Sequence, residues 1–202
     1  MAKSYVRLLM KLFVVPWLLL GFTSCSEIKD QKILYFAHSL PITHPVHKGI
    51  LAFQTSLNEK SGGKLQLKIF PDAQLGSERE VLELLQIGSV AMTKVSAASM
   101  SSFAPEYQLL GVPYLFRDRE HLFNVLEGDI GKEILLGGSE FLLRGLCYYD
   151  AGSRSFYSKE KPIESPEDLN GMKIRVMNDK MAVDMVGVLG GSATPMAYGE
   201  LY

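Results

Sequence analysis

Cysteine is scarce in this chain of 202 residues, which contains only Cys25 and Cys147. Small proteins that rely on disulfides carry several cysteines that can pair, so a disulfide-stabilised scaffold is excluded. Cys25 closes an apolar N-terminal run, and removal of that run leaves Cys147 without an internal partner. Cys147 lies in the apolar residues 146–149, and we expect it to be a small core residue rather than a nucleophile.

An excess of charge of either sign is also lacking. The chain has 21 Lys and Arg against 22 Asp and Glu, a formal net charge of −1. Residues 1–24 hold three of the basic residues and no acidic ones, so the remainder carries 18 − 22 = −4. Such a chain offers no basic patch for nucleic acid, and it must bind any anion through a local site.

Motifs for catalysis and for nucleotide binding are missing as well. The sequence has no Gly-x-Ser-x-Gly elbow, no Gly-Lys-Ser/Thr phosphate loop and no Gly-x-Gly-x-x-Gly. His44 and His47 are three residues apart at a helix start, a spacing that can bind a metal, but no further ligands lie near. We therefore favour a helix cap for His44 and a packing or surface role for His47, with no catalytic residue, cofactor or metal.

The N-terminus has the organisation of an export signal. Basic residues at positions 3, 7 and 11 precede the apolar run 12–22, which is shorter than the ~20 residues of a membrane span. The run ends in Thr-Ser-Cys25, which resembles a bacterial lipoprotein signal, although Phe22 stands where the usual pattern has Leu. We predict a signal peptide over 1–24, lipidation of Cys25 and a tether over 25–31. An uncleaved anchor and ordinary secretion are the alternatives.

The rest of the chain alternates strand-like and helix-like segments, which predicts an α/β fold with largely parallel sheets. The expected strands are 33–37, 65–70, 90–95, 145–149 (with 155–157 continuing its path), 172–177 and the short extended piece 192–195. The expected helices are 45–60, 78–87, 120–126, 130–143 and 180–189. A polar insert at 158–168 suggests a boundary between a lobe over 32–150 and a second lobe beginning at 151. The chain stops at Tyr202 in what reads as the opening of a helix, so we expect the second lobe to be incomplete.

Arg175 is the most informative side chain of this pattern. Ser165 and Pro166 suit a helix start and Gly171 suits a left-handed exit, after which residues 172–177 read as an apolar strand. Arg175 interrupts that strand near its C-terminal end. A guanidinium there is costly unless it meets an anion, which could be a ligand or an internal Asp or Glu.

Other candidate ligand contacts follow predicted strands, where open α/β sheets bind ligands. Arg154 follows the strand at 145–149 and could converge with Arg175 on one anion, or form only a surface ion pair. Asn178 could add a neutral hydrogen bond, and His38 sits where the first strand turns toward its helix. Glu78 either belongs to a plain capping segment or faces a cleft and accepts hydrogen bonds from ligand hydroxyls.

Several segments together resemble the DctP family, the extracytoplasmic solute-binding subunits of TRAP (tripartite ATP-independent periplasmic) transporters. The resemblance runs through residues 32–202, and the segments occur in the order and at the spacing of the family. They are 37–48, 70–79, 85–89, 103–107, 111–116, 167–176, 191–196 and 199–202.

The resemblance implies a periplasmic-binding-protein-like fold of two α/β lobes with a hinge, here truncated in the second lobe. It implies that Arg175 bridges a ligand carboxylate, that Arg154 matches a second family arginine and that Asn178 matches a family asparagine. Glu78 matches an acidic cleft residue of some sialic-acid-binding members, whose asparagine falls at His38.

Two serines depart from the sialic-acid-binding pattern. Ser96 and Ser99 stand where those members carry Glu and Arg, which argues against sialic acid. The run 148–157 looks closer to members that bind sugar acids such as hexuronates. The resemblance thus implies a periplasmic binding protein, not an enzyme, that passes a small carboxylate to TRAP membrane subunits for uptake driven by an ion gradient. A binding protein for a sensory receptor and a secreted α/β hydrolase are the alternatives.

Overall fold

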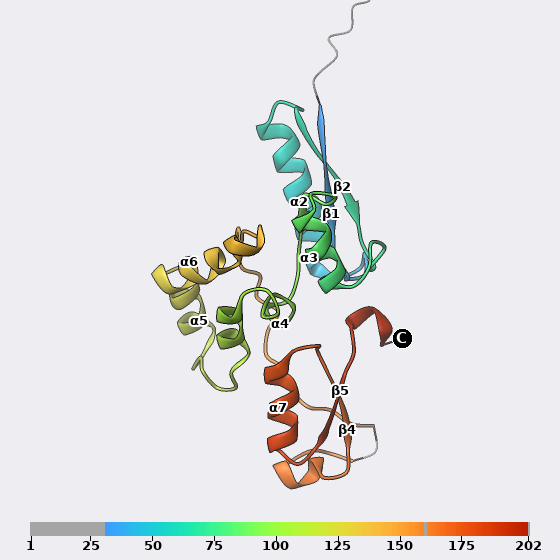
Figure 1. The fold of residues 1–202 in the computed structure, drawn as a ribbon, viewed down its shortest axis with the longest axis vertical. Coiled ribbons are helices and arrows are strands. Elements are labelled where there is room, and N and C mark those ends of the chain that lie inside the picture. Colours follow the sequence, from blue (N-terminus) through green and yellow to red (C-terminus); the bar gives the residue numbers. More distant parts are fainter. Residues whose placement is uncertain (1–30, 160, 202) are drawn as a thin grey trace, which may run out of the picture. The chain divides into compact units, whose positions relative to one another are not determined.

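The computed structural model describes residues 31–159 and 161–201. Figure 1 shows the helices and strands of these residues in chain order. The predicted signal peptide and Cys25 lie outside the described residues. Within the described ranges, the helices are all too short or too polar to cross a membrane.

The first sheet has three parallel strands in the order β2-β1-β3. The central strand β1 (Lys32–Ala37) pairs along its whole length with β2 (Leu65–Phe70) and at its C-terminal end with β3 (Met92–Thr93). The predicted third strand over 90–95 is therefore shorter than expected. Because all three strands run the same way, the residues that follow them lie at one edge of the sheet.

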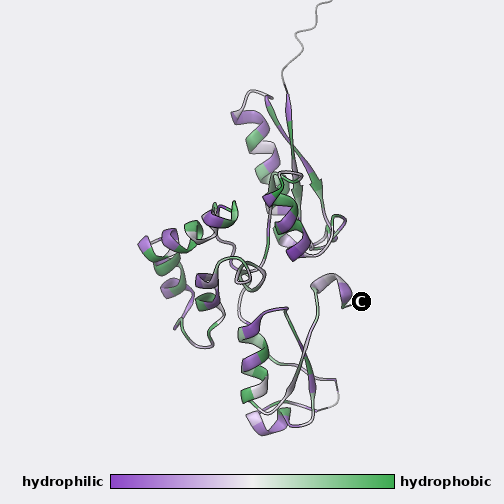
Figure 2. Ribbon diagram, viewed as in Figure 1, coloured by the Kyte–Doolittle hydropathy of each residue, from purple (hydrophilic) through white to green (hydrophobic). Residues whose placement is uncertain are grey.

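Two amphipathic helices cover the two faces of this sheet (Figure 2). Helix α2 (Pro45–Lys60) packs on the face of β1 that carries Phe36, and α3 (Glu78–Gln86) packs on the opposite face at Ala37. His44 caps α2, as expected, since its Nδ1 atom accepts from the Val46 N–H at 3.2 Å. The buried core residues on the α2 side are Phe36, Ile50 and Leu67, and those on the α3 side are Ala37, Val81 and Val90.

The middle of the chain is helical. It comprises α4 (Ala97–Met100), η2 (Pro105–Gly111), α5 (Arg119–Leu126), α6 (Asp129–Leu136) and η3 (Gly137–Phe141). The single helix predicted over 130–143 is thus divided, because α6 gives way to a 3₁₀ helix at a pair of glycines. Leu142 then takes a left-handed conformation with φ +59° and ends the helical path.

The prediction of a strand over residues 145–149 is wrong. Residues 143–157 form no regular element, and the segment packs on α6 instead of a strand. The Gly145 N–H donates to the Leu135 carbonyl at 2.8 Å, and the Tyr148 hydroxyl donates to the Gly131 carbonyl at 2.6 Å. Burial raises the pKa of Tyr148 to about 12. Cys147 is exposed, so the prediction of a buried thiol was also wrong: without a neighbouring strand, the apolar run has no sheet to be buried in.

The second sheet pairs β4 (Lys173–Val176) with β5 (Ser192–Pro195) in parallel, with α7 (Lys180–Val188) as the crossover. The predicted short helix before β4 is the 3₁₀ helix η4 (Pro166–Leu169), whose Ser165 and Asp168 form a capping box. Gly171 takes φ +75°, which confirms the left-handed exit. Each predicted lobe contains one of the two sheets, and the division of residues 32–202 into lobes stays a prediction.

Candidate functional site

Arg175 lies in β4, and its guanidinium is held by a backbone carbonyl. Its Nε and Nη2 atoms donate to the Met196 carbonyl at 3.1 and 2.7 Å, just beyond β5. Among residues 31–159 and 161–201, no carboxylate lies within ion-pair distance of Arg175. The sequence left two possible anions for Arg175, a ligand or an internal Asp or Glu, and these residues provide no internal one. A guanidinium has five N–H donors, and those left over from Met196 remain available to an anion.

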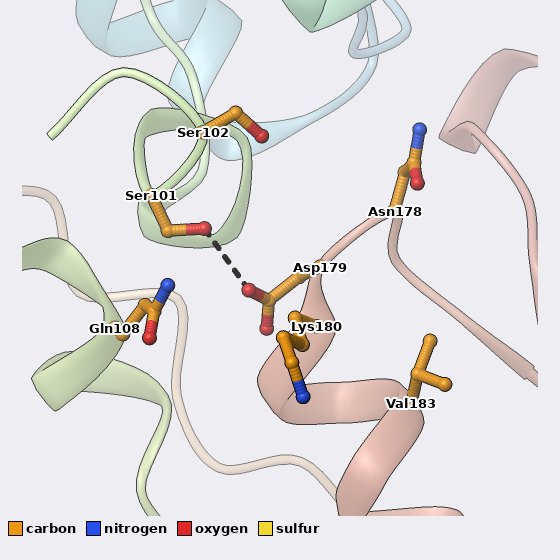
Figure 3. A pocket seen from close by; sticks show the side chains of 7 residues that line it. All are labelled: Ser101, Ser102, Gln108, Asn178, Asp179, Lys180 and Val183. Atoms are coloured by element: carbon orange, nitrogen blue, oxygen red, sulfur yellow. Dashed lines mark hydrogen bonds between the residues drawn. The ribbon is translucent and has the colours of Figure 1, made fainter. Parts of the chain in front are cut away.

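Asn178 follows β4 and is exposed at the rim of a recess of about 360 Å³ (Figure 3). One side of the recess is formed by the end of α4 and by η2, and the other side by the start of α7. Most of its lining side chains are polar: Ser101, Ser102, Gln108, Asn178, Asp179, Lys180 and Val183. Such a lining can hydrogen-bond a polar solute or water.

Asp179 is a buried residue of this region that the sequence reasoning missed. Its carboxylate caps α7, accepting from the Ala182 N–H at 3.2 Å, and also accepts from the Ser101 hydroxyl at 3.0 Å (Figure 3). The signal was present in the sequence, because an Asp between a strand and a helix is a typical N-cap. Asp179 therefore orders the turn between β4 and α7, where Asn178 lies.

His38 directly follows β1 and is 2% exposed. Its Nδ1 atom accepts from the Leu40 N–H at 3.2 Å, so the neutral ring carries its proton on Nε2, which lies 3.0 Å from His47 Nδ1. Burial, and then the neighbouring His47, lower the pKa of His38 and favour this neutral form. Both ring nitrogens are thus used within the protein. A ligand contact of His38 stays a prediction.

Glu78 is the centre of a hydrogen-bond network at the same edge of the first sheet. Its Oε2 atom accepts from the Ser96 N–H at 3.0 Å, the Ser96 hydroxyl at 2.6 Å and the Ser99 hydroxyl at 2.8 Å. Its Oε1 atom lies 3.5 Å from the Ser39 hydroxyl and 3.6 Å from Lys94 Nζ. The hydroxyls that Glu78 accepts from are therefore those of the chain itself, and its contact with a ligand stays a prediction.

Arg154 lies exposed in the irregular segment after Tyr149. It makes no hydrogen bond or ion pair with any other residue that the structure describes. Its convergence with Arg175 on one anion stays a prediction. In the described part of the chain, no cluster of three or more His, Cys, Asp or Glu side chains is arranged to hold a metal ion.

The family model of DctP, described as bacterial extracellular solute-binding protein, family 7, matches residues 36–202. Among solved structures, the chain is similar to a TRAP periplasmic solute-binding protein of Bradyrhizobium sp. BTAi1 in complex with α/β-D-galacturonate. The two are 40% identical with a TM-score of 0.81, over 85% of this chain and 57% of that one. A protein of the same description from Anaerococcus prevotii, with bound α/β-D-glucuronate, is 38% identical with a TM-score of 0.82, over 85% and 56%.

Among curated relatives, the C4-dicarboxylate-binding protein DctB of Bacillus subtilis is 33% identical over 170 residues, which are 83% of this chain and 47% of the relative. The chain spans about half the length of the curated relatives it matches. These similarities show the mixed α/β fold of periplasmic solute-binding proteins.

Proposed function

Since this chain belongs to the DctP family of bacterial extracellular solute-binding proteins, we propose that it captures a small carboxylate outside the cytoplasm, best matched by a hexuronate. It then delivers this ligand to the membrane subunits of a TRAP transporter. An ion gradient across those subunits supplies the energy for uptake, and the binding protein itself carries out no chemistry.

One observation carries the proposal: the guanidinium of Arg175 is held by a backbone carbonyl and has no carboxylate partner among residues 31–159 and 161–201. The Met196 carbonyl fixes the orientation of the guanidinium and leaves donors free for a bidentate pair with a carboxylate. A neutral analogue would leave this partly buried cation unpaired, so Arg175 acts as a filter for acids.

The choice of a hexuronate rests on the solved structures that resemble this chain, since two of them hold galacturonate and glucuronate. A hexuronate combines one carboxylate, which suits Arg175, with a ring of hydroxyl groups. Asn178, at the rim of a polar recess, offers an amide of the kind that hydrogen-bonds such hydroxyls. Arg154 would serve as a second cation near the carboxylate.

The test measures binding of D-glucuronate and D-galacturonate by isothermal titration calorimetry. We expect Arg175→Ala to weaken binding at least about 30-fold, because truncation of one partner of a desolvated charge pair costs roughly 2–5 kcal/mol. Arg119→Ala is the matched control, since Arg119 is an exposed arginine paired with Asp150, and it should bind as the unmodified protein does. Undiminished hexuronate binding by a folded Arg175→Ala variant would overturn the proposal.

For the N-terminus, we infer export by the signal peptide 1–24 and lipidation of Cys25, with residues 25–31 as the tether to the membrane. The order of basic, apolar and small residues before Cys25 supports this inference. Mass spectrometry of the mature protein should find a lipid-modified N-terminal Cys25. The Cys25→Ala variant should lack the lipid, and an unmodified Cys25 in the mature protein would contradict the inference.

A further inference from the structure

Lys94 directly follows β3, and its ammonium group carries three N–H donors. Its side chain is only 16% exposed, so the charge is partly removed from water. Its Nζ atom lies 3.6 Å from Glu78 Oε1, which is an ion pair but too long for a hydrogen bond. The ammonium makes no hydrogen bond within the described ranges. A partly desolvated ammonium with three donors is stabilised by further oxygen acceptors.

Glu78 holds this ammonium in place. Three hydrogen bonds, from Ser96 and Ser99, fix the Oε2 atom, so the carboxylate cannot turn away from Lys94. The Glu78 side chain is 12% exposed, and this arrangement ties α3 to the start of α4. Glu78 is thus a positioning residue whose charge offsets that of Lys94.

The ion pair lies where an α/β sheet binds its ligand. Ser39 and Lys94 follow β1 and β3, which are parallel neighbours, and Glu78 contacts both residues. Ligands of open α/β folds bind at the carboxyl ends of the strands. We propose that Lys94 contacts the hydroxyl oxygens of the ligand, and that its pairing with Glu78 makes the site select a polyhydroxylated monocarboxylate over a dicarboxylate.

The selectivity follows from charge. A lone ammonium would attract a second carboxylate, but Lys94 is already neutralised by Glu78, which would repel another anion at this place. A hydroxyl group carries no charge and can accept a hydrogen bond from Lys94 without meeting this repulsion. The inference rests on the proposed function. It adds Lys94 as the residue that binds the uncharged hydroxyl groups of the ligand.

The experiment measures the dissociation constants of D-glucuronate and succinate by calorimetry. We expect Lys94→Met to weaken glucuronate binding about tenfold or more, since a hydrogen bond to a charged group is lost. We expect Glu78→Gln to shift the ratio of succinate to glucuronate affinity toward succinate by about tenfold, because Lys94 is then unpaired. A purely structural role of Glu78 would lower both affinities equally and leave the ratio unchanged.

Lys68→Met is the matched control, because Lys68 is an exposed lysine on β2 of the same sheet, and it should change neither affinity more than about twofold. Glucuronate binding by Lys94→Met at the level of the unmodified protein would overturn the inference, as would an unchanged affinity ratio in folded Glu78→Gln. If Glu78→Gln does not fold, Lys94→Met decides alone. Loss of binding in Arg175→Ala together with full binding in Lys94→Met would refute this inference and leave the proposed function standing.

Discussion

The charged side chains of the two sheets differ in the partners that they meet. At the edge of the first sheet, the charge of Lys94 meets the carboxylate of Glu78, and His38 Nε2 lies beside His47 Nδ1. In the second sheet, Arg175 donates to the Met196 carbonyl and meets no carboxylate among residues 31–159 and 161–201. Because the described residues leave the guanidinium of Arg175 without an anion, our proposal assigns recognition of the ligand carboxylate to the second sheet and recognition of its hydroxyl groups to the paired Lys94 of the first.

The two sheets also differ in how much apolar surface they bury. The first has a helix on each face and buried residues from β1, β2, α2 and α3. The second is a two-stranded unit with α7, and its buried apolar side chains are Leu169, Val176 and Val186. Since burial of apolar surface is the main source of stability, the first sheet should contribute more to the free energy of unfolding.

The largest expected effect tests this difference in packing. Ile50 on α2 and Val186 on α7 are both 0% exposed. Ile50→Ala should lower the free energy of unfolding by about 2–5 kcal/mol, because it removes three buried carbons and leaves a cavity. Val186→Ala removes two carbons and should cost about 1–3 kcal/mol. Urea unfolding followed by circular dichroism measures both values.

Ile33→Ala is the control for these variants, since Ile33 on β1 is 57% exposed and its loss should cost less than about 1 kcal/mol. A cost for Val186→Ala equal to that of Ile50→Ala would show that the smaller sheet is as important to stability as the larger one. The contrast between the two sheets would then rest on their charges alone.

An intermediate effect concerns the helix caps that adjoin the two sheets. Asp179 caps α7 and is buried, whereas Ser77 caps α3 in an exposed capping box with Glu80. Asp179→Ala should cost about 1–2 kcal/mol, since it removes the cap and the acceptor for Ser101. Asp179→Asn keeps an acceptor oxygen and should cost only a few tenths of a kcal/mol.

Thermal and urea unfolding of Asp179→Ala, Asp179→Asn and Ser77→Ala give the comparison. We expect Ser77→Ala to cost less than Asp179→Ala, because water can replace an exposed cap. Equal costs for the Ala and Asn variants of Asp179 would refute the role of its carboxylate oxygens in capping.

The sequence predicted well those elements whose signals are local. Helices α2, α3 and α7 begin at caps and carry periodic apolar residues, and their predicted bounds agree with the structure to within one residue. The left-handed Gly171 and the strand containing Arg175 were found for the same reason. Caps, turns and periodicity depend only on neighbours along the chain.

Features that depend on distant partners were missed or only partly predicted. Residues 145–149 are apolar enough for a strand, but a strand needs a neighbour, and the segment packs on α6 instead. Glu78 was noticed, but its partners Ser96 and Ser99 are 18 and 21 residues away. That Arg175 meets no carboxylate in the described part of the chain can be seen only in the folded protein.

The smallest expected effect is a dependence of stability on pH that arises at the edge of the first sheet. Burial and His47 lower the pKa of His38 below 6.5 in the folded state, so the unfolded chain binds the proton more readily. Stability is therefore full above about pH 6.5 and falls as the pH drops through the range between the two pKa values. Urea unfolding from about pH 8 to about pH 5 should show this loss, and His38→Gln, which cannot titrate, should show a smaller one. If both proteins lose the same free energy of unfolding, the pH dependence of stability arises from other groups. Burial in the first sheet would then not be what keeps His38 neutral.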